Sequence, residues 1–437
     1  MFKKILAILL VAVMACASFA SCTGTNTKRL GESADVLPRE EVKPTLTNVP
    51  DDFKIGLICL HDENSTYDYN FIKAMNSVKE ALKLKDEQLL VATGIAEDEA
   101  CYNKAIEFVN AGCKVIFADS FGHEEHIAKA AKEHPEVQFC HATGVSAHVL
   151  GLDNFQNAFA SIYEGRYIAG IVAGMKLNEM IADGKITAEQ AVIGYVGAFT
   201  YAEVISGMTS FYLGAKSICP SVTMKVKYTG SWYDQTKELE AAKALIEDEK
   251  CVLISQHADS LGAPSQCQKA GVPNVSYNGS TYNAGKDTFL ISSAINWAPY
   301  FLHIIECTVN GTDIEADYTG SILTNSVVLS GLNEDVIAEG TREKVDAAIA
   351  ALKAGTLHVF DVNTFTVTVD AENNVNANAT VDENGHLTAY LADTDGDFAG
   401  DTNVIHDGYF DESGKDFRSA PYFDIIIDGI TNLDTVY

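Results

Sequence analysis

Two kinds of apolar spacing follow one another in the middle of the chain and predict alternating strands and helices. The apolar run 192–196 predicts a strand, and Val204 to Phe211 then follow at helical spacing. Alternation over 224–228 predicts a second strand, and Asp234 is a typical N-cap for the helix after it. Strand, helix, strand and helix in this order form the unit of a parallel sheet covered by helices.

Similar patterns continue on both sides of this unit. Strands are predicted at 54–60, 89–93, 114–118, 137–141, 251–255, 274–277 and 288–292, and helices at 68–84, 98–110, 123–133, 265–270 and 296–310. Residues 157–182 predict one long helix, in which Gly170 and Gly174 allow close packing. Glycines at this spacing also occur in membrane helices. Arg166 and Lys176 leave too short an apolar span for a membrane helix, so we expect packing in a protein core.

The pattern weakens after residue 310. A strand at 326–329, a helix at 343–352 and further strands at 365–369, 389–391 and 422–427 are predicted. From residue 371 onward Lys415 and Arg418 are the only basic residues, so this part of the chain is strongly acidic. We expect a β-rich C-terminal addition packed on the rest of the protein.

The composition narrows the classes of protein and partner. With 437 residues the chain has room for two or three domains of about 150 residues each. Its 47% hydrophobic and 21% charged residues are typical of a globular protein. The formal net charge of −29 argues against nucleic acid and anionic lipid as partners, because both require a basic surface.

The first 22 residues have the layout of an export signal. Two lysines precede the apolar stretch 5–15, and small residues lead to Cys22. The stretch is too short for a stable membrane span, and a cysteine in this place is the usual lipidation point of a bacterial lipoprotein. We expect a signal peptide at 1–21, lipid on Cys22 rather than on Cys16, and a tether at 22–51. The alternative is a secreted protein in which Cys22 is incidental.

No convincing catalytic or metal-binding motif stands out. The sequence contains no G-x-G-x-x-G, no G-x-x-x-x-G-K-[ST] and no G-x-S-x-G motif. His123 and His126 are one residue too close for a zincin site, and the polar start of a helix explains them. Three alternating aspartates at 393–397 resemble the opening of a calcium loop, but Phe398 and Val404 stand where the loop needs Gly and Glu. We therefore favour a solvated acidic turn over weak calcium binding and predict no metal site and no cofactor.

The eight cysteines other than Cys16 and Cys22 form no C-x-x-C pair. Their spacing predicts neither a zinc site nor a dense disulfide framework, and leaves open one or two bridges.

Four segments together carry a family resemblance. They are KIGLICLHDENSTYDYNFIKAM, NAFASIYEGRYIAGIVAGM, GYVGAFTYAEVISGMTSFYLGAKSICP and YTGSWYDQTKELEAAKALI, and the resemblance covers roughly residues 54–310. In combination they resemble the basic membrane protein (Bmp) family of solute-binding lipoproteins, which serve ABC importers. The better-understood members of that family bind purine nucleosides.

The resemblance implies an α/β, two-lobe fold of the periplasmic-binding-protein type I kind, with a mainly parallel sheet in each lobe. The lobes are expected to close over the solute by hinge motion. We expect the first lobe at 52–155 and 293–310, the second lobe at 156–292 and 311–361, and the acidic extension at 362–437. The strands predicted at 54–60 and 192–196 should then lie in different sheets.

The resemblance also implies ligand-binding residues after the first strand. Tyr69 and Asn70 match the aromatic residue and the asparagine that the family carries there. Asp68 stands where the family has Ser, and Thr66 where it has an acidic residue. Capping of the following helix is an equally good explanation of Asp68.

In the second lobe, the family positions fall on residues after predicted strands. Trp232 matches the aromatic that stacks on the nucleobase, with a place in the core as its alternative. Asp259, followed by Gly262, resembles the ribose-binding acid, because a carboxylate accepts hydrogen bonds from two vicinal hydroxyls. Asn278 is a further candidate. We expect a purine base between Tyr69 and Trp232, with its ribose on Asp259.

The function expected from the sequence is that of a lipid-anchored, monomeric solute receptor on the extracytoplasmic face of the cell membrane. Its partners would be a small solute, with a purine nucleoside favoured, and an ABC permease. A sugar or other small-solute receptor on the same scaffold is the first alternative. An extracytoplasmic hydrolase is the second, and the lack of a nucleophile–base motif argues against it.

Overall fold

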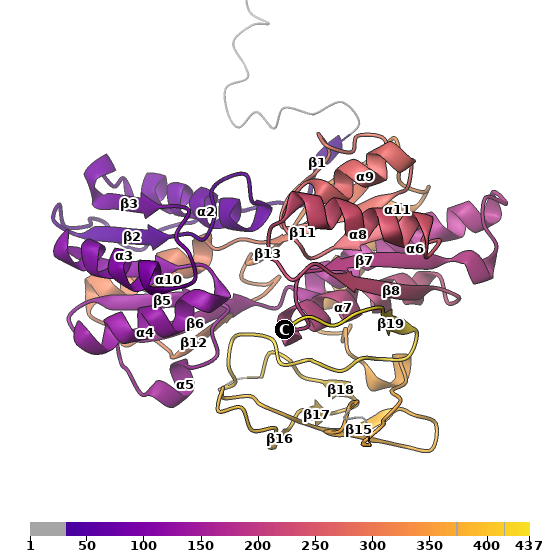
Figure 1. Ribbon diagram of the computed structural model, residues 1–437. Helices are drawn as coiled ribbons and strands as arrows, with labels where there is room; N and C mark the ends of the chain where they lie inside the picture. Colours follow the sequence, from indigo (N-terminus) through magenta and orange to yellow (C-terminus); the bar gives the residue numbers. More distant parts are fainter. Residues whose placement is uncertain (1–31, 373–374, 415) are drawn as a thin grey trace, which may run out of the picture.

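The computed structural model describes residues 32–372, 375–414 and 416–437. Figure 1 shows two α/β lobes side by side, with a C-terminal segment beneath them. Each lobe has a mainly parallel sheet flanked by helices, which confirms the expected fold class. Cys22 and the predicted signal peptide lie outside the described residues.

The first lobe contains a six-stranded sheet in which every neighbouring pair is parallel. Its strands are, in spatial order, β12 (Asp317–Gly320), β6 (Phe155–Ala160), β5 (Gln138–Ala142), β4 (Cys113–Ala118), β2 (Lys54–Ile58) and β3 (Leu89–Ala92). Its helices are α2 (Thr66–Leu82), α3 (Glu99–Asn110), α4 (Glu124–Glu133), α5 (Ala147–Leu150) and α10 (Ala298–Asn310). Helix α10 belongs here because the Phe301 ring lies 4.6 Å from the Phe117 ring of β4.

The second lobe contains an eight-stranded sheet built from distant parts of the chain. Its strands are, in spatial order, β1 (Glu32–Leu37), β13 (Val327–Asn333), β11 (Phe289–Ile295), β10 (Asn274–Tyr277), β9 (Leu253–Gln256), β7 (Val192–Gly197), β8 (Thr223–Tyr228) and β19 (Ile430–Asn432). Its helices are α6 (Tyr163–Ala182), α7 (Ala202–Ile218), α8 (Gln235–Glu247), α9 (Gly262–Ala270) and α11 (Thr341–Lys353). Only the pairs β1–β13 and β13–β11 are antiparallel.

Helices α6 and α7 touch through glycines, as the spacing predicted. A Cβ atom on Gly170 would lie 2.0 Å from the Phe211 carbonyl oxygen, and one on Gly214 would lie 2.0 Å from the Tyr167 carbonyl oxygen. No side chain fits at either place, so the two helices can pack this closely only with glycine there.

Strands β2 and β7 lie in different sheets, which confirms the two-lobe arrangement. The expected helix at 157–182 is only partly right, because residues 155–160 form strand β6 and helix α6 begins at Tyr163. All six residues of β6 are buried. A strand buried on both faces has no alternation to distinguish it from a buried helix.

The observed lobe boundaries differ from the expected ones in two places. Strand β12 was expected in the second lobe, within 311–361, but it pairs with β6 of the first lobe. The expected tether at 22–51 contains strand β1, which pairs with β13 in the second lobe. Both are short strands added at sheet edges, and their own residues carry little apolar pattern.

The C-terminal extension, residues 362–437, has little regular structure. Its short strands are β14 (Ala379–Val381), β15 (Leu387–Ala392), β16 (Thr402–Asn403), β17 (Ile405–His406) and β18 (Tyr409–Phe410), and it ends with β19. The strands predicted at 365–369 and 422–427 are not present. Residues 365–369 are extended, but Thr366 and Thr368 donate side-chain hydrogen bonds to Asp428 and form no ladder with a neighbouring strand.

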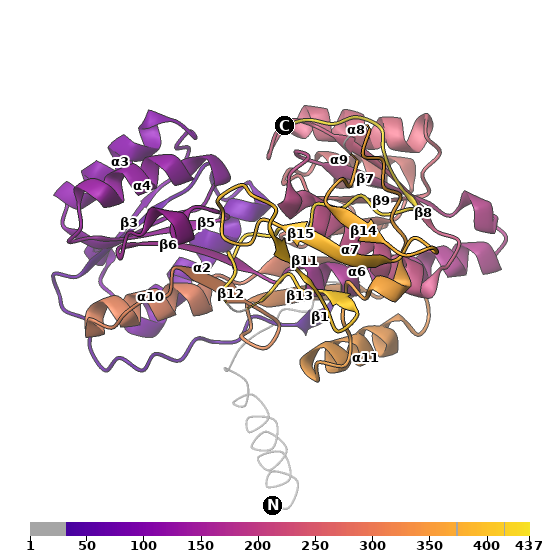
Figure 2. The same ribbon diagram turned by 90° about the horizontal axis from the view of Figure 1, so that it is seen from below.

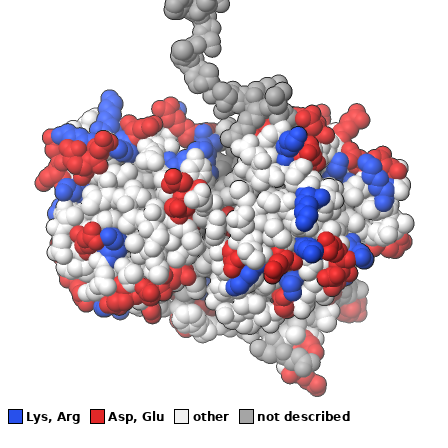
Figure 3. Space-filling model, turned by 45° about the horizontal axis from the view of Figure 1, so that its top comes forward, with Lys and Arg blue, Asp and Glu red and all other residues white. Residues whose placement is uncertain are grey.

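Three general properties complete the description. Among the described residues no helix has the length and apolarity needed to cross a bilayer. All eight cysteines in this part of the chain are free thiols. The face drawn in Figure 3 carries acidic and basic side chains interspersed around both lobes.

Candidate ligand-binding site

A narrow cavity lies between the two lobes, with about 360 Å³ of empty space when the solvent at its mouth is included. The first lobe lines it with Leu60, His61, Tyr67, Asp68, Ser120, Phe121 and Thr143, and the second lobe with Glu203, Trp232, His257, Asp259 and Asn278. Each of these residues follows the carboxyl end of a parallel strand, from β2, β4 and β5 in one lobe and from β7 to β10 in the other. This is where open α/β sheets bind their ligands.

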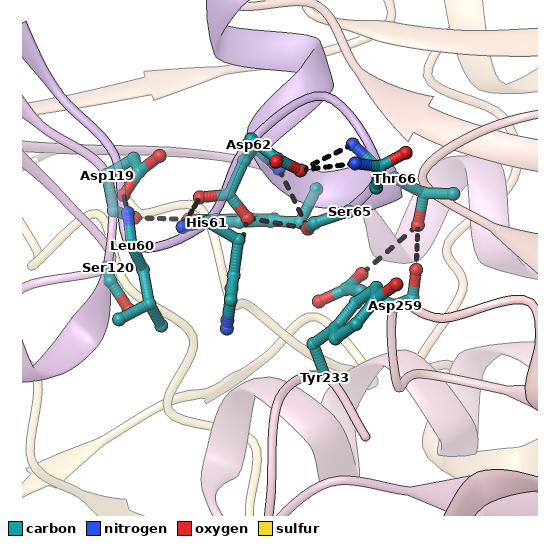
Figure 4. A network of polar contacts seen from close by, with 12 residues as sticks. Leu60, His61, Asp62, Ser65, Thr66, Asp119, Ser120, Tyr233 and Asp259 are labelled. Atoms are coloured by element: carbon teal, nitrogen blue, oxygen red, sulfur yellow. Dashed lines mark hydrogen bonds and ion pairs between the residues drawn. The ribbon is translucent and has the colours of Figure 1, made fainter. Parts of the chain in front are cut away.

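Asp68 is fixed in the first-lobe wall by the start of helix α2. Ser65 is the N-cap of this helix and accepts a hydrogen bond from the Asp68 amide at 3.3 Å. The His61 amide donates to Asp68 Oδ1 at 2.7 Å. Burial raises the pKa of Asp68, but hydrogen bonds from His61 and Ser65 outweigh it and leave this pKa below its usual value. Asp68 is therefore an ionised carboxylate, and Figure 4 labels two of its hydrogen-bond partners, His61 and Ser65.

Asp119 lies behind Asp68 and is completely buried. Burial, followed by the charge of Asp68, raises the pKa of Asp119 well above its usual value. The Leu60 amide donates to Asp119 Oδ1 at 3.0 Å, and Tyr67 Oη donates to the Asp119 carbonyl at 2.7 Å. Burial and the charge of Asp68 thus favour the protonated form of Asp119, and Tyr67 is held in place beside the cavity.

Asp259 is the buried acid of the second-lobe wall. Asn278 Nδ2 donates to Asp259 Oδ1 at 2.8 Å, and the Asp259 amide donates to the Trp232 carbonyl at 3.0 Å. Burial raises the pKa of Asp259 well above its usual value, against the opposing effect of the Asn278 hydrogen bond. None of the described residues donates a hydrogen bond to Asp259 Oδ2, so this oxygen is available to a ligand.

Trp232 is held in the same wall by other rings. Its ring lies 4.9 Å from Phe199, 6.2 Å from Tyr201 and 6.2 Å from His257. His257 Nε2 is 3.4 Å from Glu203 Oε1, yet burial lowers the pKa of His257 and keeps the imidazole neutral. The second-lobe wall therefore offers a supported aromatic face beside polar side chains.

Arg166 supports this wall from beneath and was not expected to do so. Its guanidinium is fully buried and lies 4.6 Å from the Tyr277 ring centroid. Its Nη2 atom donates to Tyr195 Oη at 2.6 Å and to the Gln256 carbonyl at 3.2 Å. The chain is thereby fixed immediately before His257.

Direct contacts join the lobes across the cavity. Thr66 Oγ1 donates to the Asp259 carbonyl at 3.1 Å, and Asn70 Nδ2 donates to the Asn278 carbonyl at 2.7 Å. The rings of Phe121 and Tyr201, one from each lobe, are 5.3 Å apart. Figure 4 shows the contact between Thr66 and Asp259. The structure therefore represents a closed arrangement of the lobes.

Two residues that line the cavity have an unusual backbone conformation. Thr143 has φ 72° and Asn278 has φ 61°. Asparagine tolerates this region, but a β-branched threonine adopts it only at a cost of about 1–3 kcal/mol. Strained backbone of this kind concentrates at functional sites.

The structure brings together Asp68, Trp232, Asp259 and Asn278 of the seven ligand-binding residues expected from the sequence. Asn70 is buried beside the cavity and bridges the lobes. Tyr69 is outside this cavity: its side chain is 46% exposed and lines a separate one with Arg39 and Lys73.

Gly262 is also outside the cavity, at the start of α9. A Cβ atom there would lie 2.4 Å from the Gln235 carbonyl oxygen, so this glycine permits packing of α9 on α8.

The aromatic residues that line this cavity from the first lobe are Tyr67 and Phe121, and Tyr67 is the one that lies near Tyr69 in the sequence. Residues 67 and 69 both lie in the first turn of α2. Side chains two residues apart on a helix point in nearly opposite directions. The position of Ser65 as the N-cap would have distinguished them. The remaining residues that the sequence reading missed, such as Ser120 and His257, directly follow predicted strands and could have been found by that rule.

Two clusters among the described residues have the spacing of metal ligands. Cys59, Asp68 and Asp119 form one, in which the protonated form of Asp119 is favoured. Asp393, Asp395 and Asp397 form the other, in which Arg418 Nη1 is 2.7 Å from Asp393 Oδ2. Arg418 thus pairs with one of the three aspartates of the second cluster.

Two mainly parallel α/β lobes that close over a cavity at the strand ends are the architecture of the type I periplasmic-binding-protein fold. Residues 58–344 match the family model Bmp, described as ABC transporter substrate-binding protein PnrA-like, and the chain belongs to this family. The family and the fold are those of extracytoplasmic solute-binding proteins.

Curated relatives agree with this assignment. The chain is 33% identical over 262 residues to a purine-binding protein of Brucella abortus, covering 59% of this chain and 69% of the relative. It is 32% identical over 234 residues to a putative ABC transporter glucose-binding protein of Haloferax volcanii, covering 53% of this chain and 56% of the relative.

Solved structures agree on the fold. A solute-binding protein from Conexibacter woesei superposes with a TM-score of 0.56 at 20% identity, covering 70% of this chain and 98% of that structure. A solute-binding protein from Aeropyrum pernix superposes with a TM-score of 0.55 at 15% identity, covering 70% of this chain and 87% of that structure.

Proposed function

We propose that this protein is the lipid-anchored receptor of an ABC importer and that it carries a purine nucleoside between its lobes. The observation that carries the proposal is the lining of the cavity. It has an aromatic ring on each wall, Tyr67 and Trp232, and the buried carboxyl group of Asp259 beside Trp232. The relative from Brucella abortus, whose name describes a purine-binding protein, supports a purine as the solute.

Each half of the lining suits one half of a nucleoside. A purine ring is flat and stacks on the faces of Tyr67 and Trp232, which the surrounding contacts already hold in place. The vicinal hydroxyl groups of ribose donate to Asp259, whose Oδ2 atom is available, and the Asn278 amide keeps the carboxyl group oriented. No Lys or Arg side chain lines the cavity among the described residues, which favours a solute without phosphate.

The anchor and the partner complete the proposal. Lipid on Cys22 would keep the receptor at the membrane as a monomer, where it delivers the solute to its permease. Cys22→Ala should release the protein into the soluble fraction. A variant that stays fully bound to membranes would contradict the anchor.

A sugar is the second candidate solute. The relative from Haloferax volcanii, named a putative glucose-binding protein, favours it, and Asp259 with an aromatic neighbour could hold a sugar ring.

Calorimetry separates the two candidates. The purified protein is titrated with adenosine, guanosine, inosine, adenine and glucose. We expect tight binding of at least one nucleoside, weaker binding of the free base and none of glucose. A thermal-shift assay supports the result, because a ligand at a hundredfold its dissociation constant stabilises the protein by about 2.7 kcal/mol. Binding of glucose without any nucleoside would contradict the proposal.

A further inference from the structure

The C-terminal extension is attached to both lobes. Ser419 Oγ donates to Asp317 Oδ1 of the first lobe at 2.7 Å. In the second lobe, the Thr200 amide donates to the Val436 carbonyl at 2.7 Å. Figure 2 shows this segment, in yellow, lying across the junction of the lobes. The extension therefore forms a third wall beside the two that close on the solute.

An outer chamber, defined as the space between the extension and the two lobes, adjoins the inner cavity. Phe121, Thr143 and Glu203 line both spaces. With the solvent at its mouth, the outer chamber contains about 2230 Å³ of empty space, against about 360 Å³ in the inner cavity. The inner cavity and the outer chamber thus meet at these three residues.

The outer chamber exposes apolar side chains that a folded protein normally buries. Phe398 is 84% exposed, Val375 and Leu391 are each 43% exposed, and Phe121 is 37% exposed. All four line this one chamber. Exposed apolar side chains that gather in a concave surface mark a binding site.

The charges of the chamber disfavour an anionic ligand. Among the described residues of the lining, Arg418 is the only cationic one, and Asp393 already pairs with it at 2.7 Å. Glu203 and Asp424 add further acidic groups. A phosphate would therefore meet carboxyl groups and no free positive charge.

The same lining suits a neutral, hydroxyl-rich group. The C–H face of a sugar ring packs on an aromatic ring such as Phe121 or Phe398, while carboxyl and amide groups such as Glu203 and Asn378 bond its hydroxyls.

We propose that the outer chamber binds a neutral glycosyl group attached to the solute, so that the receptor's preferred ligands are glycosylated nucleosides. This inference rests on the proposed function, because the nucleoside itself occupies the inner cavity. The extension supplies most of the outer subsite, and the two lobes supply the passage to it.

The test is a calorimetric comparison on the full chain. Adenosine and guanosine are titrated alone and as glucosides that carry glucose on the 5′-oxygen or on the exocyclic amino group. We expect at least one glucoside to bind several-fold more tightly than its parent nucleoside. Phe398→Ala should weaken glucoside binding about two- to tenfold, since one aromatic contact contributes about 0.5–1.5 kcal/mol. The affinity for the parent nucleoside should stay unchanged.

A matched control is Leu323→Ala, which removes an apolar side chain that is 69% exposed and lies outside the chamber. Leu323→Ala should change neither the affinity for the nucleoside nor the affinity for its glucoside. If the nucleosides bind but every glucoside binds equally or more weakly, the outer subsite is refuted and the nucleoside proposal stands. If neither nucleosides nor glucosides bind, the proposed function fails and this inference fails with it.

Discussion

The two walls of the cavity occupy equivalent places in their lobes but are held by different forces. Hydrogen bonds fix the first-lobe wall: Asp68 is held by His61 and Ser65, and Tyr67 by the Asp119 carbonyl. In the second-lobe wall, ring packing around Trp232 adds to hydrogen bonds such as that of the buried Arg166 guanidinium to the Gln256 carbonyl.

The difference suggests a division of labour. The second lobe also holds strands from both ends of the described chain, β1 and β19. We infer that it is the prepared platform on which the solute first rests, and that the first lobe closes over it with polar contacts such as Thr66 to Asp259.

The largest expected effect comes from removing the acid of the second-lobe platform. Asp259→Ala should weaken nucleoside binding at least about 30-fold, because two hydrogen bonds worth about 1–3 kcal/mol each are lost. Binding of the free base should change little, since it has no ribose. The nucleoside affinity of Asp259→Asn should lie between that of the wild type and that of Asp259→Ala.

Calorimetry with nucleoside and free base checks this, with Asp62→Ala as the control. Asp62 is an exposed acid in the neighbouring first-lobe loop and does not line the cavity. An equal loss for nucleoside and base would contradict the role of Asp259 in ribose binding.

The next effect concerns how the extension is attached to the second lobe. Glu412 is buried and bonded to Ser206 of α7, and burial raises its pKa from 4.5 to about 7. The folded protein thus holds this proton more tightly than the unfolded chain does. Its contribution to stability is present below pH 4.5 and is lost as the pH rises to about 7, by up to about 3 kcal/mol.

Glu412→Gln stays neutral at every pH and should reduce this loss. Urea unfolding of both proteins across that pH range measures the difference. Burial also raises the pKa values of Glu164 and Glu238 to about 7. Both residues are present in the wild type and in the variant, so their contributions cancel when the two pH profiles are subtracted. The same pH dependence in the variant would contradict the prediction.

The smallest effect tests which tyrosine belongs to the first-lobe wall. Tyr67→Ala should weaken nucleoside binding about 5- to 150-fold, because stacking on an aromatic ring contributes about 1–3 kcal/mol per base. Tyr69→Ala removes a similar side chain that faces away from the cavity, and should leave affinity unchanged. The reverse order of effects would restore the original expectation for Tyr69.

The sequence predicted the lobes well because their elements repeat a strong pattern. Strands such as β2 and β7 are short apolar runs that end before helices with one apolar face, so their type and order were clear. Strands β6 and β12 were misplaced, because a fully buried strand and a short edge strand lack the alternation on which such predictions depend.

The C-terminal extension and the exact site residues were predicted less well. The extension is stabilised by side-chain hydrogen bonds such as Thr366 to Asp428, which leave no periodic pattern in the sequence. In the site, Trp232 and Asp259 follow strands and were placed correctly beside the cavity. The sequence placed Tyr69 beside the cavity that Tyr67 lines, because a shift of two residues reverses the direction of a side chain on a helix.

Tryptophan fluorescence tests most directly whether a purine stacks on Trp232. The chain has two tryptophans, and Trp297 is buried in the first lobe, 4.3 Å from the Phe71 ring and outside the cavity. Titration with the best-bound nucleoside should change the emission in a saturable way. The change should persist in Trp297→Phe and disappear in Trp232→Phe. A signal that survives in Trp232→Phe, or calorimetric binding with no change in emission, would contradict the account.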